Sequence, residues 1–296
     1  MKGTSQKVQV LKALTKPRKR KSPRTNFIAP KKARRAKQAT GLQFLESQQK
    51  RFVIWAGKSS IEKLSERLRR FLPERESFWE SVLKAGMSRQ EYEDRLLNRS
   101  KIRSRVGGIY RAARLVLSAA EWKKPAIGAG DGSATARGFQ WRTTMAWTGL
   151  ELLCDSLFPR IHNCEADIVL EWCQLLGLAV IAEEIKVPAG LKRSAKIRNL
   201  WREEVDILEF LDVRGGKPKR SLDAWWVKKT PIADYAVALQ AARAIRDVTS
   251  HGLLSAHRVE KFGLVSGKRN GAAPLDRLVD VMVIVALETL KKLLAT

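Results

Sequence analysis

Cysteine and histidine are scarce in this sequence, which narrows the chemistry that it can carry. The 296 residues include three cysteines and three histidines. An odd number of cysteines, two of them on apolar segments, is typical of reduced and mostly buried thiols rather than of a disulfide framework. His162 and Cys164 lie close together, but no second pair of ligands accompanies them to complete a zinc site. We therefore expect no metal site and no cofactor.

Long apolar runs are also missing. No segment approaches the roughly 20 residues that cross a bilayer, and the N-terminus has no apolar stretch of the signal-peptide type. We expect no membrane partner and predict a cytoplasmic protein, or a nuclear or nucleoid-associated one if the source is eukaryotic or the chain binds DNA. Apolar residues make up 44% of the chain, which is enough for a true hydrophobic core.

Acidic residues are few relative to basic ones. The chain has 57 Lys and Arg against 30 Asp and Glu, so its formal net charge is +27. Residues 1–40 hold 14 of these basic residues and no acidic residue. A charge excess of this size concentrates polyanions at the protein surface. Nucleic acid is therefore the first partner to consider, and an acidic protein is the second.

The first 40 residues form a basic tail. Like charges crowd together, proline recurs and apolar residues are few, so this segment cannot bury enough surface to offset the entropy lost on ordering. We predict that residues 1–40 are disordered. They would serve either as a nucleic-acid-binding arm or as a solubilising or localising tail without dedicated contacts. The cations assigned to the arm are Lys16, Arg18, Lys19, Arg20, Lys21, Arg24, Lys31, Lys32, Arg34, Arg35 and Lys37.

The rest of the chain is predicted to be helical. Apolar residues recur at three- and four-residue spacing, and Ser88 with Glu91 is typical of a capping box. No segment shows the alternation of a half-buried strand. We predict an all-α protein, with an N-terminal helical unit at 41–122, a Gly-, Ala- and Ser-rich linker at 123–138 and a helical-bundle domain at 139–296.

One long helix in the C-terminal domain has clear signals at both ends. Thr230 is its expected N-cap, Pro231 its first residue and Gly252 the residue after its end. Before it, Trp225 and Trp226 follow a basic loop, and they would either stack on bases or pack at a helix start. The helices expected in this domain span residues 139–159, 166–185, 194–213, 231–251 and 273–296.

The C-terminal end of that long helix carries Arg246, Asp247, Ser250 and His251. Asp247 and His251 are four residues apart and can share one helix face. Arg246 and His251 are about 140° apart around the helix, but the length of Arg lets both converge on one phosphate. Glu151, on the helix at 139–159, is a candidate partner for Arg246, and Ser250 is a candidate supporting residue.

These residue types suit RNA cleavage without a metal. A histidine can exchange the protons of the reaction, and an arginine can grip phosphate oxygens in a fork. Asp247 would orient either the imidazole or Arg246. A plainer interpretation is that Arg246 and His251 stabilise the helix C-terminus, while Asp247 pairs with Arg243 on a solvated face. We interpret His257, beside a second arginine, as a surface residue.

The segment "RDVTSHG" resembles the Arg-polar-x-x-x-His motif of the HEPN (higher eukaryotes and prokaryotes nucleotide-binding) superfamily, and "WRTTMAWTGLELL" resembles its W-x-x-L-E helix. The resemblance covers residues 137–296, although the part at 160–230 is long for the family. It implies a helical bundle, a homodimer in which Arg and His of two protomers share a cleft, and metal-independent endoribonuclease activity. Many members are toxins or defence effectors, and some have lost activity and only bind.

Two hypotheses follow from the sequence. The first is a metal-independent HEPN-type endoribonuclease with Arg246, Asp247 and His251 as catalytic residues and a basic RNA-binding arm. It includes a toxin masked by an acidic antitoxin or partner protein. The second is a non-catalytic nucleic-acid-binding accessory or adaptor of a mobile element or defence system, which would hold RNA or DNA through the tail.

Overall fold

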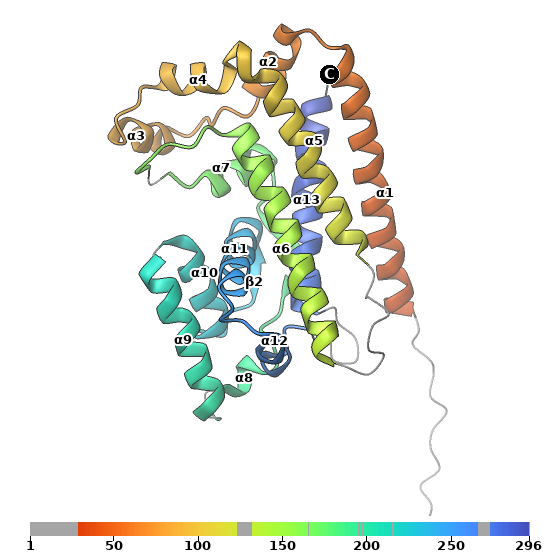
Figure 1. Cartoon of the computed structure of the whole chain (residues 1–296), viewed down its shortest axis with the longest axis vertical. Helices are drawn as coiled ribbons and strands as arrows, with labels where there is room; N and C mark the ends of the chain where they lie inside the picture. Colours follow the sequence, from red (N-terminus) through yellow and green to blue (C-terminus); the bar gives the residue numbers. More distant parts are fainter. Residues whose placement is uncertain are drawn as a thin grey trace, which may run out of the picture.

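Helices dominate the computed structural model (Figure 1), which describes residues 29–122, 132–164, 166–194, 196, 198–214, 216–265 and 273–295. The predicted all-α class is confirmed, and the described strands form a single two-stranded antiparallel sheet. The helices of the first half are α1 (Ala29–Lys58), α2 (Ile61–Arg69), α3 (Glu76–Lys84), α4 (Arg89–Leu97) and α5 (Arg99–Glu121). The second half contains α6 (Gly132–Leu157), α7 (Ile168–Leu175), β1 (Val180–Ile185), α8 (Leu191–Ser194), α9 (Arg198–Arg214), α10 (Lys217–Trp226), β2 (Ile232–Asp234), α11 (Tyr235–Ser250), α12 (Ala256–Phe262) and α13 (Pro274–Leu294).

Four long helices, α1, α5, α6 and α13, run alongside one another (Figure 1). Their apolar faces share one core, to which Leu45 and Phe52 of α1 contribute together with Leu278 of α13. Arg142 of α6 also pairs with Asp276 of α13 at 2.7 Å. Helices from the expected 41–122 unit and from the expected 139–296 domain therefore share one hydrophobic core.

Helix α6 links these four long helices to a second group of helices. It contacts α5 and α13, and it also contacts α11 and α12. Helix α11 in turn packs against α7, α9 and α10 (Figure 1). The neighbours of α6 explain how Glu151 on α6 comes to face the C-terminal part of α11.

A small apolar cluster joins α3 and α4. Phe78, Trp79 and Tyr92 contact one another edge to face, with ring centroids 5.2–5.7 Å apart. Both hydrogen bonds of the predicted capping box between Ser88 and Glu91 are present at the start of α4. Local sequence signals and aromatic packing thus agree in this part of the chain.

Several predicted boundaries were wrong. Residues 29–40, assigned to the disordered tail, belong to α1, and residues 132–138, assigned to the linker, belong to α6. Residues 1–28 and 123–131 lie outside the described residues. Trp225 and Trp226 have no exposed surface, so they are packing residues, but they lie at the end of α10 rather than at its start.

The two strands were also missed by the sequence prediction. The expected helix over 166–185 ends at Leu175, and β1 follows and pairs with β2. The N-cap of α11 is Asp234, whose carboxylate accepts a hydrogen bond from the Val237 N–H at 3.0 Å. Since β2 occupies the residues after Pro231, the helix begins four residues later than expected. A short apolar run does not distinguish a strand from a helix by periodicity alone.

Gly190 allows the turn before α8 to approach the end of α12. Its N–H donates to the Phe262 carbonyl oxygen at 3.0 Å, and a Cβ at this position would overlap the backbone of Lys261 and Phe262. We expect Gly190→Ala to lower the free energy of unfolding by at least ~2 kcal/mol, because backbone must move. Gly138 lies on α6 with open space around it. Gly138→Ala should therefore raise the free energy of unfolding by up to ~1 kcal/mol, because alanine favours a helix more than glycine does. Urea unfolding of both variants checks this prediction, and equal effects would contradict it.

Candidate functional site

The C-terminal turn of α11 holds Arg246 and His251 in fixed relation to the core. Ile245 and Val248 are buried and anchor this turn. His251 is the C-cap residue, and its backbone N–H donates to the Asp247 carbonyl oxygen at 3.1 Å. Gly252 follows with φ +74°, the left-handed conformation that commonly ends a helix. The predicted end of this helix is thus confirmed.

Two carboxylates hold the Arg246 guanidinium. Its Nη2 lies 2.5 Å from Glu151 Oε2, and its Nη1 lies 2.8 Å from Asp247 Oδ1. Arg246 and Asp247 are only 24% and 16% exposed, which strengthens these charge-assisted hydrogen bonds. The predicted contact between Glu151 and Arg246 is confirmed. Asp247 pairs with Arg246, and not with Arg243 as the plainer interpretation required.

His251 is exposed at the end of α11. Its ring lies against Phe210 of α9, with centroids 5.2 Å apart. No hydrogen bond or ion pair joins its imidazole to another residue in the part of the chain that the structure describes. Ser250 is also exposed, at the last position of α11. The imidazole is therefore accessible and not committed to a partner within the chain, whereas Arg246 is.

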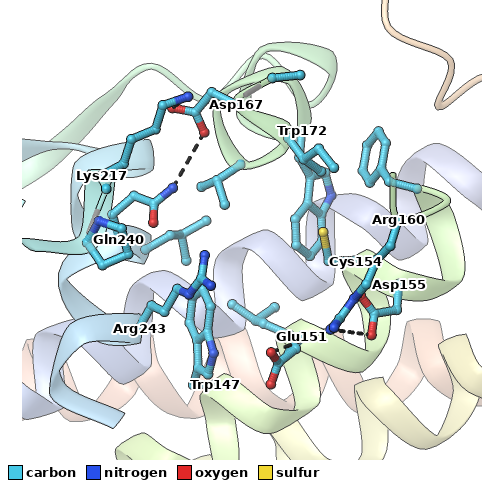
Figure 2. A pocket seen from close by; sticks show the side chains of 18 of the residues that line it. Trp147, Glu151, Cys154, Asp155, Arg160, Asp167, Trp172, Lys217, Gln240 and Arg243 are labelled. Carbon is cyan, nitrogen blue, oxygen red and sulfur yellow. Dashed lines mark hydrogen bonds and ion pairs between the residues drawn. The ribbon is translucent and has the colours of Figure 1, made fainter. Parts of the chain in front are cut away.

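A cleft of about 1010 Å³ lies next to the two carboxylates that pair with Arg246, and Figure 2 shows side chains that line it. It is formed by α6, the loop that follows α6, α7, the first turn of α10 and α11, with Leu211 of α9. Glu151 and Asp247, the two carboxylates that hold Arg246, line it. Gln240 and Arg243 lie on the same face of α11 as Asp247 and line it as well. No local sequence signal indicates this cleft, because its walls come from segments that are far apart in the chain.

The charges in the cleft are partly paired. Arg160 Nε and Nη2 lie 2.6 and 2.7 Å from the two carboxylate oxygens of Asp155. This hydrogen bonding raises the pKa of Arg160. At the other end of the cleft, Lys217 Nζ lies 3.0 Å from Asp167 Oδ2 (Figure 2). Each of these carboxylates therefore has a cationic partner.

The Cys154 thiol is a poor candidate nucleophile in this cleft. Cys154 contributes to its wall, but burial raises the pKa of the Cys154 thiol to about 12. The thiol is therefore protonated near neutral pH and is a poor nucleophile. Burial likewise raises the pKa of Cys173 to about 12. Within the described ranges, no three or more His, Cys, Asp or Glu residues are grouped as metal ligands would be.

The predicted arm is only partly described. Lys31, Lys32, Arg34, Arg35 and Lys37 lie on the N-terminal half of α1, whose backbone is helical. His257 is exposed in the first turn of α12, as expected for a surface residue. Among the described helices, none is both long and apolar enough to cross a membrane. The remaining predicted arm residues, which lie outside the described part, are Lys16, Arg18, Lys19, Arg20, Lys21 and Arg24.

Comparison of the chain with family models, with curated proteins and with solved structures found no match. The resemblance to the HEPN superfamily therefore depends on the motifs at Trp147–Glu151 and Arg246–His251. The ion pair between Glu151 and Arg246 brings these two segments together in the fold.

Proposed function

We propose that this chain is a metal-independent endoribonuclease of the HEPN type. The observation that carries the proposal is the pairing of Arg246 with Glu151 and Asp247 just before the exposed His251 at the end of α11. This arrangement fixes the orientation of a cationic fork one helical turn before an imidazole that is exposed. Both segments that resemble the family contribute to it.

The proposed reaction is internal transesterification of RNA. A 2′-hydroxyl loses its proton and attacks the adjacent phosphorus, and the bond from phosphorus to the 5′-oxygen breaks. The leaving 5′-oxygen takes up a proton, so the products are a 2′,3′-cyclic phosphate and a 5′-hydroxyl. His251 would exchange these protons, and Arg246 would stabilise the negative charge of the phosphorane.

Arg246 retains donors for this role. Two of the five N–H groups of a guanidinium suffice for its contacts with Glu151 and Asp247. Its Nε–H is buried and has no hydrogen-bond partner among the described residues, so the donors left for a substrate are the remaining N–H groups of Nη1 and Nη2. Glu151 and Asp247 act as positioning residues, because they fix the orientation of Arg246 without being proton carriers themselves. One chain contributes a single His251, so a homodimer would supply the second catalytic group.

The basic tail would add affinity for RNA, with a steep dependence on salt. The same surface would bind an acidic antitoxin or other acidic partner protein, which suits a toxin or defence effector. The second candidate function is a non-catalytic accessory or adaptor that binds nucleic acid. The observation that favours it is the extent to which Glu151 and Asp247 already neutralise Arg246.

Cleavage of RNA in the presence of EDTA tests the proposal. We expect the purified full-length chain to cut an RNA of mixed structure and to leave 2′,3′-cyclic phosphate ends, which mass spectrometry of the fragments identifies. Inhibition by EDTA would contradict the metal-independent mechanism. Binding of RNA without any cleavage would favour the accessory protein.

A further inference from the structure

The cleft beside Arg246 has the size and walls of a small-molecule site. Its volume of about 1010 Å³ lies at the upper end of the range typical of ligand pockets. Trp147, Phe158 and Trp172 contribute aromatic surface to its walls. A ligand with a ring could therefore bury apolar area there.

The unpaired charge in this cleft is positive. The four carboxylates that line it belong to Glu151, Asp155, Asp167 and Asp247, and each has an arginine or lysine within 3.0 Å. Arg220 and Arg243 also line the cleft, and neither guanidinium has a hydrogen bond or ion pair with another described residue. Both side chains are exposed. Arginine is the residue that best matches the oxygen geometry of a phosphate.

The N-terminus of α10 adds a second positive feature. Residues 216–220, which include its first turn, line the cleft. Its N-cap residue is Gly216, at φ +92°, so no side chain caps this helix end. The partial positive charge of a helix N-terminus attracts anions, and phosphate groups in particular.

Two buried polar atoms in the cleft wall lack partners. Trp147 and Gln240 are both 6% exposed and both line the cleft. The Trp147 Nε1–H donor and the Gln240 Oε1 acceptor have no hydrogen-bond partner among the described residues. In Figure 2 the Gln240 amide lies between Asp167 and Arg243, with its nitrogen turned to Asp167. An unmatched buried donor and acceptor are costly without a ligand.

We propose that this cleft binds a small phosphate monoester that carries an apolar or aromatic ring. The phosphate lies with Arg220, Arg243 and the N-terminus of α10, and the ring lies against the aromatic wall near Trp147. The site is distinct from the surface at His251 and does not depend on the ribonuclease proposal. It adjoins that surface only through Glu151 and Asp247.

Isothermal titration calorimetry on the full-length chain tests this site, with phenyl phosphate and inorganic phosphate as probes. Salt should be high enough to screen the basic tail. We expect phenyl phosphate to bind more tightly than inorganic phosphate, since only the ester has a ring to bury. Arg243→Gln should weaken phenyl phosphate binding about tenfold, as the loss of a charge-assisted contact implies. Trp147→Phe, which keeps an aromatic ring but removes the N–H and part of the indole surface, should weaken phenyl phosphate binding about fivefold.

Arg111→Gln is the matched control, because Arg111 is exposed on α5, outside the cleft, and the net charge changes equally. It should bind phenyl phosphate as the wild type does. Equal affinities of the Arg243 and Arg111 variants would overturn the proposal. Absence of phenyl phosphate binding by the folded wild type would do the same, and so would binding confined to 5′-phosphorylated RNA. Retention of phenyl phosphate binding by His251→Ala would show that this site is separate from cleavage.

Discussion

Replacement of His251 by alanine is expected to reduce RNA cleavage by at least ~100-fold, because general acid–base catalysis contributes about 10²–10⁴ to such reactions. The fold should survive. The His251 side chain is exposed, and its described contact is with the Phe210 ring. The backbone hydrogen bond from residue 251 to Asp247 does not depend on the side chain. Single-turnover cleavage of RNA in EDTA measures the loss, and circular dichroism checks the fold.

His257→Ala is the matched control for this experiment. His257 is exposed and lies beside Arg258 on α12, so the substitution removes another accessible imidazole from a basic segment. It should leave cleavage within about twofold of the wild type, since surface substitutions of this kind have small effects. Full activity of His251→Ala would rule out the assignment of His251. A similar loss of cleavage in both variants would indicate that His251 and His257 contribute through RNA binding rather than through proton transfer.

The C-terminal end of α11 could be predicted from the sequence more accurately than its start. Signals within a few residues of one another, such as Gly252 after the last turn and the capping box at Ser88, determine local backbone geometry and appear as expected. The start of α11 depended on whether the residues after Pro231 paired with another strand. That partner, β1, lies about 50 residues away in the chain, and no local signal specifies it.

The same distinction applies to the site. The contact between Glu151 and Arg246 could be predicted because each residue belongs to a motif, although they lie 95 residues apart. The positive charge of the cleft could not be predicted from the sequence, because it depends on which cations pair with carboxylates in the folded chain. The plainer interpretation paired Arg243 with Asp247, but Asp247 binds Arg246 and Arg243 lines the cleft. Helical spacing alone favours Arg243, four residues before Asp247, over the adjacent Arg246. The observed pairing therefore reflects the packing of α6 against α11, which brings Glu151 to Arg246.

These pairings also explain how two adjoining surfaces can differ in function. Glu151 and Asp247 face the cleft, yet their charge is directed to Arg246. The cleft therefore retains the positive charge of Arg220 and Arg243, while Glu151 and Asp247 hold Arg246 in one orientation. Loss of either carboxylate would change both the cleft and the surface at His251. Substitution of Arg243 changes only the cleft, and substitution of His251 changes only the surface at the end of α11.

The basic tail should control the salt dependence of RNA binding. Its contribution can be measured in the His251→Ala background, which we expect to bind RNA without cutting it. Replacement of the six cations by glutamine should lower the slope of log K against log salt by up to ~4, at about 0.7 per phosphate contact on single-stranded RNA. Affinity near physiological salt should fall by several orders of magnitude if most of these contacts form. The six residues are Lys16, Arg18, Lys19, Arg20, Lys21 and Arg24.

A second set of substitutions shows whether the arm continues into α1. It replaces with glutamine the five cations between 31 and 37, which lie on helical backbone. A helix presents its side chains in several directions, so fewer of these five can reach one RNA strand, and the slope should fall by less than for the first set. Fluorescence anisotropy with a single-stranded RNA over a range of salt concentrations measures both slopes. An unchanged slope in the first set would refute the arm, because counterion release requires that its cations contact phosphates.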